Sequence, residues 1–186
     1  QLAHIAIDIT TFGAHPSLAD NTPHILSAIM SANEGDTVIV PQGIYNITQS
    51  IVIDKNINFE MHGTFNVLHD GVALEFRALG RATTFIPKVR VKLVKSQANH
   101  LSDTSKGLVI NSCYGMDIRV DYLSNFTTNL EVTATEGRGC VYNNFSLGQI
   151  YNGKTQLKIT TDGNELSWSN QNTFVGGRLY YPNAGN

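Results

Sequence analysis

Short runs of alternating apolar and polar residues follow one another along most of this chain. Val89, Val91 and Leu93 alternate with basic residues, and Leu157 and Ile159 alternate with polar ones. A period of two is typical of β-strands that bury one face. By this pattern, or by short apolar runs, strands are predicted in TVIV, IYNITQSIVI, INFEMHGTFNVL, VALEF, KVRVKLV, GLVI, MDIRV, NLEVTA, CVYNNFSLGQI, TQLKIT and NTFVGGRLYY. The pattern indicates an all-β fold.

One segment, "DNTPHILSAIMSANEG", has the period of a helix instead. Ile25 and Ile29 are four residues apart, so they lie on one apolar side of a helix. Thr22 is a good N-cap, and Pro23 suits the first helical position because its missing N–H is not needed there. We expect a helix over residues 22–33 that covers one end of the strand structure.

The connections between strands leave the topology open at first. Pro41 and Gly43 separate TVIV from the next strand, which indicates either a hairpin or a corner between two sheets. The pairs Asn152-Gly153 and Asp162-Gly163 also suit hairpins, so an antiparallel β-sandwich remains an alternative.

A loose repeat favours a stacked coil over the sandwich. Asn111, Asn143 and Asn172 each lie next to an apolar strand, with spacings of 32 and 29 residues. Repeats of roughly 20–30 residues are typical of solenoids. Asparagines at corresponding corners of such a coil can form ladders of hydrogen-bonded amides. We therefore expect about six rungs from residue 36 onward.

Composition narrows the class of protein. The 186 residues suffice for one core, only 15% are charged, and the net charge is −2 without a basic block, so no nucleic-acid partner is expected. No apolar run approaches the roughly 20 residues that cross a bilayer, so no membrane insertion is expected. The chain begins at Gln1 without a signal-like segment, and we expect a fragment or a processed product. Residues 1–34 are predicted to form an N-terminal strand and a capping helix, and residues 35–186 one continuous coil.

Two cysteines, Cys113 and Cys140, lie outside any CxxC or Cys/His cluster. We expect no metal and no cofactor. A disulfide between the two is one alternative, and two buried apolar thiols are the favoured one.

The opening of the chain, "DITTFGAHPSLADNTPHILSAIMSANEGDTVIVPQGIYNI", resembles that of pectin-lyase-like right-handed parallel β-helix proteins. Those begin with an aspartate, Phe-Gly-Ala, a polar loop, a helix and then Gly-x-Thr-Val-x-Val-Pro-x-Gly-x-Tyr. The matching residues are Asp8, Phe12, Gly13, Ala14, Asp20, Asn21, Thr22, Gly35, Thr37, Val38, Val40, Pro41, Gly43 and Tyr45. The likeness covers about the first 65 residues, and "NQNTFVGGRL" is similar to a recurring rung of bacterial and phage members.

The resemblance implies a single-stranded right-handed parallel β-helix with a short capping helix. In such a coil the segments on either side of Pro41 and Gly43 belong to different faces. Phage spikes of this type are usually parallel homotrimers, so a homotrimer is expected, in the virion tail or outside the cell.

The fold alone does not assign an activity. The polygalacturonase motifs (Asn-Thr-Asp, Asp-Asp, Gly-His-Gly and Arg-Ile-Lys) do not occur in the sequence. Asp117 and Asp121 are four residues apart, about 13 Å along a strand, whereas glycosidase carboxylates lie about 5–9.5 Å apart. Glu131 or Glu136, one rung along, are closer candidates, although we expect all these acids to be solvated on the outside.

Binding of a cell-surface polysaccharide makes fewer demands, because aromatic faces and planar polar groups suffice. The first candidates are Tyr114, Arg119, Tyr122, Tyr151, Trp168, Arg178 and Tyr180. Trp168 is expected in an exposed corner, and the long irregular stretch 96–106 carries His100 and Asp103. The predicted carbohydrate-binding residues are Tyr114, Asp117, Arg119, His100, Asp103 and Trp168.

Three functions follow from these observations. The favoured one is a β-helix domain of a phage tail fibre or tailspike that recognises a host-surface glycan without turnover of its own. The second is a polysaccharide depolymerase, either a lyase or a glycoside hydrolase, that uses carboxylates on the outer face. The third is a purely structural trimeric stalk.

Overall fold

The computed structural model describes residues 4–80, 85–96 and 104–180, and most of these residues lie in β-strands. The helical elements are η1 (Ile9–Phe12), a 3-10 helix, and α1 (Thr22–Ser31). The strands are β1 (Ala6–Asp8), β2 (Thr37–Val40), β3 (Ile44–Ile47), β4 (Ile51–Ile53), β5 (Asn58–Met61), β6 (Thr64–Val67), β7 (Val72–Arg77), β8 (Lys88–Lys95), β9 (Lys106–Asn111), β10 (Asp117–Ser124), β11 (Thr128–Ala134), β12 (Gly139–Val141), β13 (Asn144–Tyr151), β14 (Thr155–Thr161), β15 (Trp168–Asn170) and β16 (Thr173–Tyr180).

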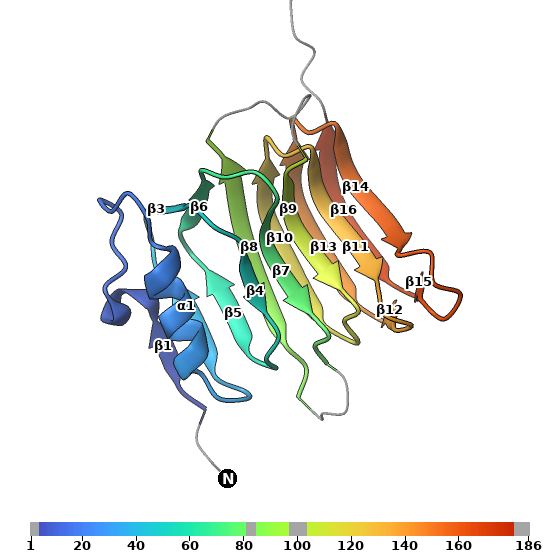
Figure 1. Cartoon of the computed structure of the whole chain (residues 1–186), viewed down its shortest axis with the longest axis horizontal. Coiled ribbons are helices and arrows are strands. Elements are labelled where there is room, and N and C mark those ends of the chain that lie inside the picture. The colour runs from blue at the N-terminus through green and yellow to red at the C-terminus, as the bar shows by residue number, and fades with distance from the viewer. Residues whose placement is uncertain (1–3, 81–84, 97–103, 181–186) are drawn as a thin grey trace, which may run out of the picture.

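The strands form three sheets (Figure 1). Sheet A has the order β1-β2-β5-β8-β10-β13-β16, with β3 and β6 alongside; sheet B has the order β14-β11-β9-β7-β4; and sheet C consists of β12 and β15. Every strand pair within the described ranges is parallel. The fold is therefore all-β with parallel sheets, and the antiparallel sandwich is wrong.

The turn at Pro41 and Gly43 does not lead to a different sheet. It separates β2 from β3, and both belong to sheet A, because the long strand β8 pairs with β5 over its first half and with β6 over its second. The prediction that the two strands lie on different faces is wrong. The chain changes sheets one strand later, when it enters β4 in sheet B.

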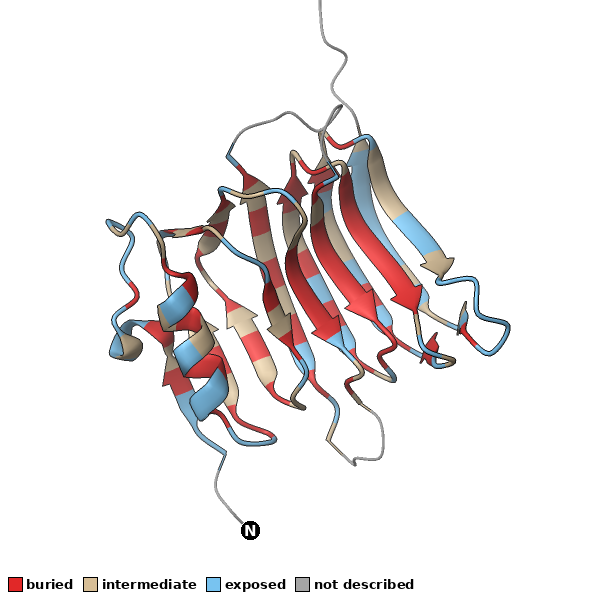
Figure 2. Ribbon diagram, in the orientation of Figure 1, coloured by how far each residue is buried: buried red, intermediate tan, exposed pale blue. Residues whose placement is uncertain are grey.

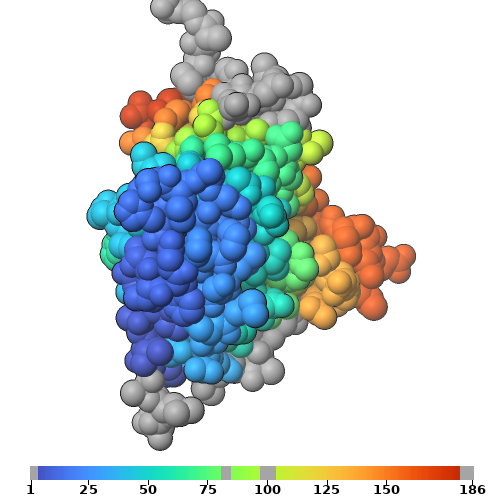
Figure 3. All heavy atoms as spheres, turned by 60° about the vertical axis from the view of Figure 1, so that its left-hand side comes forward, coloured from blue at the N-terminus to red at the C-terminus, as the bar shows by residue number. Residues whose placement is uncertain are grey.

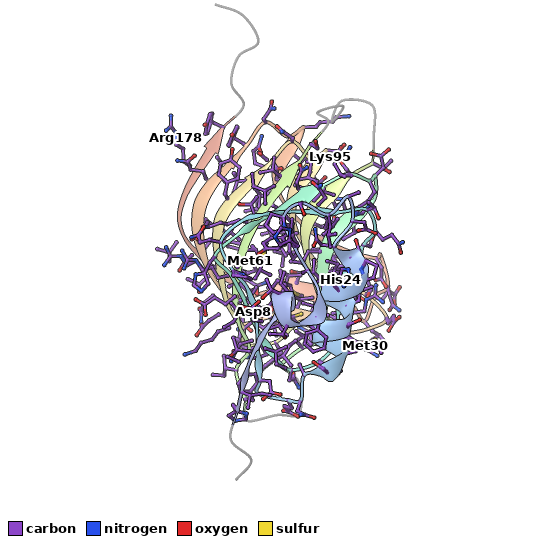
Figure 4. The ribbon with its side chains drawn as sticks, turned by 90° about the vertical axis from the view of Figure 1, so that its left-hand side faces the viewer. Asp8, His24, Met30, Met61, Lys95 and Arg178 are labelled. Carbon is purple, nitrogen blue, oxygen red and sulfur yellow. The ribbon has the colours of Figure 1, made fainter. Side chains whose placement is uncertain are left out.

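The core lies between the sheets and is filled by every second residue of their strands. In β8 the apolar residues Val89, Val91 and Leu93 are buried, while the residues between them are partly exposed. Figure 2 shows how burial is concentrated in the central strands. Seen from the N-terminal end, Met61 lies inside and Arg178 projects from the outer side (Figure 4). Cys113 and Cys140 are buried thiols in this core and are not joined by a disulfide, as the favoured prediction had it.

Helix α1 lies at the N-terminal end of the sheets, against η1 and β4 (Figure 1). Ile25 and Ile29 are buried as predicted. Thr22, however, is not the N-cap but the first helical residue, and its hydroxyl donates to Asp20 at 2.6 Å. The helix ends two residues early, and Lys55 donates from Nζ to the carbonyl oxygens of its last turn.

The predicted asparagine ladder exists only in part. Asn143, just before β13, donates from Nδ2 at 2.9 Å to Oδ1 of Asn172, just before the neighbouring strand β16. Asn111 is not a member, since it ends a strand of sheet B and its amide donates to Glu75. Ladders that the repeat did not indicate join Asn66 to Asn46 at 2.8 Å and, elsewhere, Asn152 to Asn125.

Of the helices that the structure describes, none is long and apolar enough to cross a membrane.

Candidate functional site

A polar hollow of about 410 Å³ lies on the outer face of sheet A, and we call it the sheet A hollow. It spans the strands β2, β5, β8, β10 and β13 near their N-terminal ends. Its polar lining residues are Thr37, Asn58, Glu60, Lys88, Arg90, Asp117, Arg119, Asn144 and Ser146.

Alternation within the strands turns these side chains outward. In β10, Asp117 and Arg119 are exposed, whereas Ile118 and Val120 are buried. Parallel register then aligns equivalent positions across the sheet. In the strand register, Arg119 is the neighbour of Arg90 in β8 and of Ser146 in β13. The floor of the hollow consists of such rows, which place side chains from distant parts of the chain next to one another.

A β-bulge shapes one border of the hollow. Val120 pairs with Val91 and Tyr122 with Lys92, so Asp121 is an extra residue in β10. The bulge continues into β13, where a Cβ on Gly148 would lie 2.4 Å from the backbone oxygen of Asp121. Bulges are common beside functional sites because they redirect a side chain.

The carboxylate of Asp121 joins two arginines at this border. It accepts from Nε of Arg119 and from Nε of Arg90, both at 2.6 Å. Burial alone would raise the pKa of Asp121, but the hydrogen bonds from Arg119 and Arg90, with the charge of the arginines, lower it below its usual value. Asp121 is therefore a fixed anion, and the two guanidiniums keep further N–H donors for a ligand.

The predicted site residues do not form one cluster. Asp117 and Arg119 line the sheet A hollow. Tyr114 does not line it but pairs with Val141 at the edge of sheet C, the sheet that also contains Trp168. Both aromatic side chains are nearly half exposed, and Tyr114 contacts the ring of Tyr142 edge-on.

The two remaining predicted residues, His100 and Asp103, lie outside the described residues.

The carboxylate candidates are also dispersed. Asp117 and Asp121 lie on β10 in sheet A, whereas Glu131 lies on β11 in sheet B, so it does not stack beside them. Glu131 is also not a solvated residue, because it is buried and ion-paired to Lys106 at 2.7 Å. Within the described ranges, no group of three or more His, Cys, Asp or Glu side chains could hold a metal ion.

Sequence reasoning missed several residues of the hollow: Asn58, Lys88, Arg90, Asn144 and Ser146. Alternation in "KVRVKLV" already places Lys88 and Arg90 on one face. It does not reveal which strands are neighbours, because the connections between strands differ in length.

No protein-family model, curated protein or solved structure matches this chain.

Proposed function

We propose that the chain is a right-handed parallel β-helix domain of a phage tail fibre or tailspike that binds a host-surface polysaccharide in the sheet A hollow. The parallel pairing supports the coil, since the partner in the next strand lies roughly 20–34 residues further along the chain. The β-helix, the phage origin and a location in the virion tail or outside the cell rest on the resemblance of the first 65 residues.

The observation that carries the binding role is the Arg90–Asp121–Arg119 group beside an open polar hollow. Saccharides present many hydroxyl groups that both donate and accept, and the hollow presents both kinds of partner. Arginine N–H groups donate, carboxylates such as Asp117 accept, and the amide of Asn144 does both. Because Asp121 fixes each guanidinium through Nε, less side-chain freedom is lost when a ligand binds.

The lining of the hollow combines three cations, Lys88, Arg90 and Arg119, with the carboxylates Glu60 and Asp117, and Asp121 lies at its border. We infer that the bound segment is a stretch of polysaccharide in which hydroxyl groups outnumber charges. Asp121 is not offered as a general acid, since its pKa is lowered and a general acid needs a raised one.

A glycan array of bacterial surface polysaccharides tests the binding role. The wild type is compared with Arg119→Ala and with the control Arg138→Ala, an arginine that pairs with Glu136 outside the hollow. Loss of a charged hydrogen-bond donor predicts a roughly tenfold to hundredfold weaker signal for Arg119→Ala. Arg138→Ala is expected to bind like the wild type.

If no polysaccharide is retained, the stalk is the better hypothesis. If a retained polysaccharide loses viscosity or gains reducing ends, the chain is a depolymerase. The expected homotrimer is tested separately by light scattering coupled to size-exclusion chromatography, where a monomer would contradict it.

A further inference from the structure

The outer face of sheet B carries a second polar hollow, of about 420 Å³, which we call the sheet B hollow. Register places Glu75 of β7, Val109 of β9 and Glu131 of β11 in one row across its floor. Lys158 of β14 continues that row. The next row includes Thr133. The sheet B hollow is independent of the sheet A hollow, because the two lie on different sheets.

Glu75, at one end of the row, accepts hydrogen bonds on both carboxylate oxygens. Arg77 donates to both of its carboxylate oxygens, at 2.9 and 2.8 Å, and Asn111 donates to Oε1 at 2.9 Å. These contacts account for the burial of a charged residue on an outer face. Glu75 thus forms a fixed wall of the hollow.

Among the described residues, Glu131 accepts a hydrogen bond on one oxygen only. Its side chain is 5% exposed, and Oε1 accepts from Nζ of Lys106 at 2.7 Å. Oε2 is buried and accepts no hydrogen bond from the part of the chain that the structure describes; Nζ of Lys158 forms an ion pair with it at 3.6 Å, which is too long for a hydrogen bond. A buried acceptor without a hydrogen bond is costly, so a ligand that donates to Oε2 would recover that free energy.

The surroundings of this oxygen indicate the chemical class of the ligand. Charged groups of both signs line the hollow in equal number: Arg77, Lys106 and Lys158 against Glu75, Glu131 and Asp162. This balance favours a ligand without net charge. Val109 lies between the two glutamates but is only 4% exposed, so the floor there offers a ligand little apolar surface. The Cα atoms of the two glutamates are about 9.6 Å apart across two strand spacings. Donors and acceptors side by side on the lining complement a ligand that carries several hydroxyl groups.

One edge of the sheet B hollow is raised. Thr161 and Asp162 line it at the end of β14. The segment that follows them protrudes from the molecule, in orange at the right of Figure 3. A ligand above Val109 would therefore meet a wall on this side.

We propose that the sheet B hollow binds a neutral polyhydroxylated ligand, such as a pyranose, with one hydroxyl donating to Oε2 of Glu131. Lys158 covers Oε2 in this structure, and its side chain is about half exposed, at 49%. Moving it aside gives up the 3.6 Å ion pair to Oε2 but little packing, and its ammonium group can then donate to a ligand oxygen.

The test uses the full chain and the methyl glycosides of glucose, galactose and mannose, together with xylitol, as probes. Binding is followed through the amide chemical shifts of Val109, Glu131 and Thr133. For at least one probe we expect saturable shifts, with Kd raised roughly tenfold or more by Glu131→Gln and roughly twofold to tenfold by Thr133→Val. The control Thr64→Val, the same change outside both hollows, is expected to leave Kd unchanged.

Three results would overturn the proposal. They are the absence of saturable shifts for every probe, wild-type affinity in both hollow variants, and tighter binding of glucuronate or glucosamine than of the methyl glucoside. If Glu131→Gln fails to fold, Thr133→Val decides alone, because it keeps the shape and the ion pairs. Arg119→Ala is expected to leave probe binding intact, so failure of the sheet A hollow and of this site can be told apart.

Discussion

Replacing Asn143 by alanine should destabilise the protein strongly, because its amide bonds buried backbone groups. Asn143 is fully buried, and its Oδ1 accepts from the backbone N–H of Met116 at 3.0 Å. Its Nδ2 donates to the carbonyl oxygen of Cys113 at 3.1 Å and to Asn172. Alanine leaves the first two backbone groups without this partner in a place that water does not reach.

The magnitude follows from those two groups. A buried donor or acceptor that loses its partner costs about 1–3 kcal/mol, so the pair costs about 2–6 kcal/mol. For a chain of this size a loss of about 4 kcal/mol lowers Tm by roughly 8–16 °C. The matched control is Asn144→Ala, one residue along, where the side chain is exposed and donates to Asp117 at 3.2 Å. That change should stay within about 0.5 kcal/mol.

Urea unfolding followed by far-UV circular dichroism gives both free energies of unfolding. Equal midpoints and slopes for Asn143→Ala and Asn144→Ala would refute the reasoning. In that case the buried amide would not be what holds the adjoining strands at this corner.

Three further predictions follow from the fold and the site. Ile29→Asp should lower the free energy of unfolding by several kcal/mol, because it buries an unpaired charge. Met30→Asp, at the neighbouring residue that is 75% exposed, should change Tm little. Equal Tm values for the two variants would show that α1 does not cover the core. The pKa of Asp121 is lowered in the folded state, so the stability that this carboxylate contributes is fully present above the ordinary pKa of 3.8 and is lost as pH falls through the lower folded value. The difference in unfolding free energy between wild type and Asp121→Asn should therefore shrink below about pH 3.8. A difference that stays constant with pH would contradict this. Burial raises the pKa of Cys113, and Cys140 is equally buried, so neither thiol should react with a disulfide reagent until urea unfolds the chain; rapid labelling of native protein would contradict the buried positions.

Many strands could be predicted from the sequence because apolar and polar residues alternate along them, as in β8 and β11, and that pattern is local. The same holds for α1, where the spacing of Ile25 and Ile29 is enough. The prediction that Thr22 is the N-cap is wrong, because a hydroxyl at the start of a helix can either cap the helix or, as here, donate to a preceding aspartate. Local patterns thus predict elements better than they predict hydrogen-bond partners.

The arrangement of the site was harder to predict, because it depends on register between distant strands. Asn111 and Asn143 look equivalent in sequence, but Asn111 ends β9 in sheet B, whereas Asn143 lies in the connection between β12 and β13. The bulge at Asp121 also cannot be predicted from the sequence, because a bulge is defined only by the register with a neighbouring strand, here β8. Arg119 could be predicted as a binding residue from the pattern of its own strand, whereas the place of Arg90 beside it became clear only from the structure.

Hydrogen–deuterium exchange with the polysaccharide retained on the array tests the central claim most directly. If the sheet A hollow binds it, amides in β10 and β13 should exchange more slowly with polysaccharide present, and this protection should disappear in Arg119→Ala. Unchanged exchange in both strands, or protection that persists in Arg119→Ala, would contradict the assignment of the site.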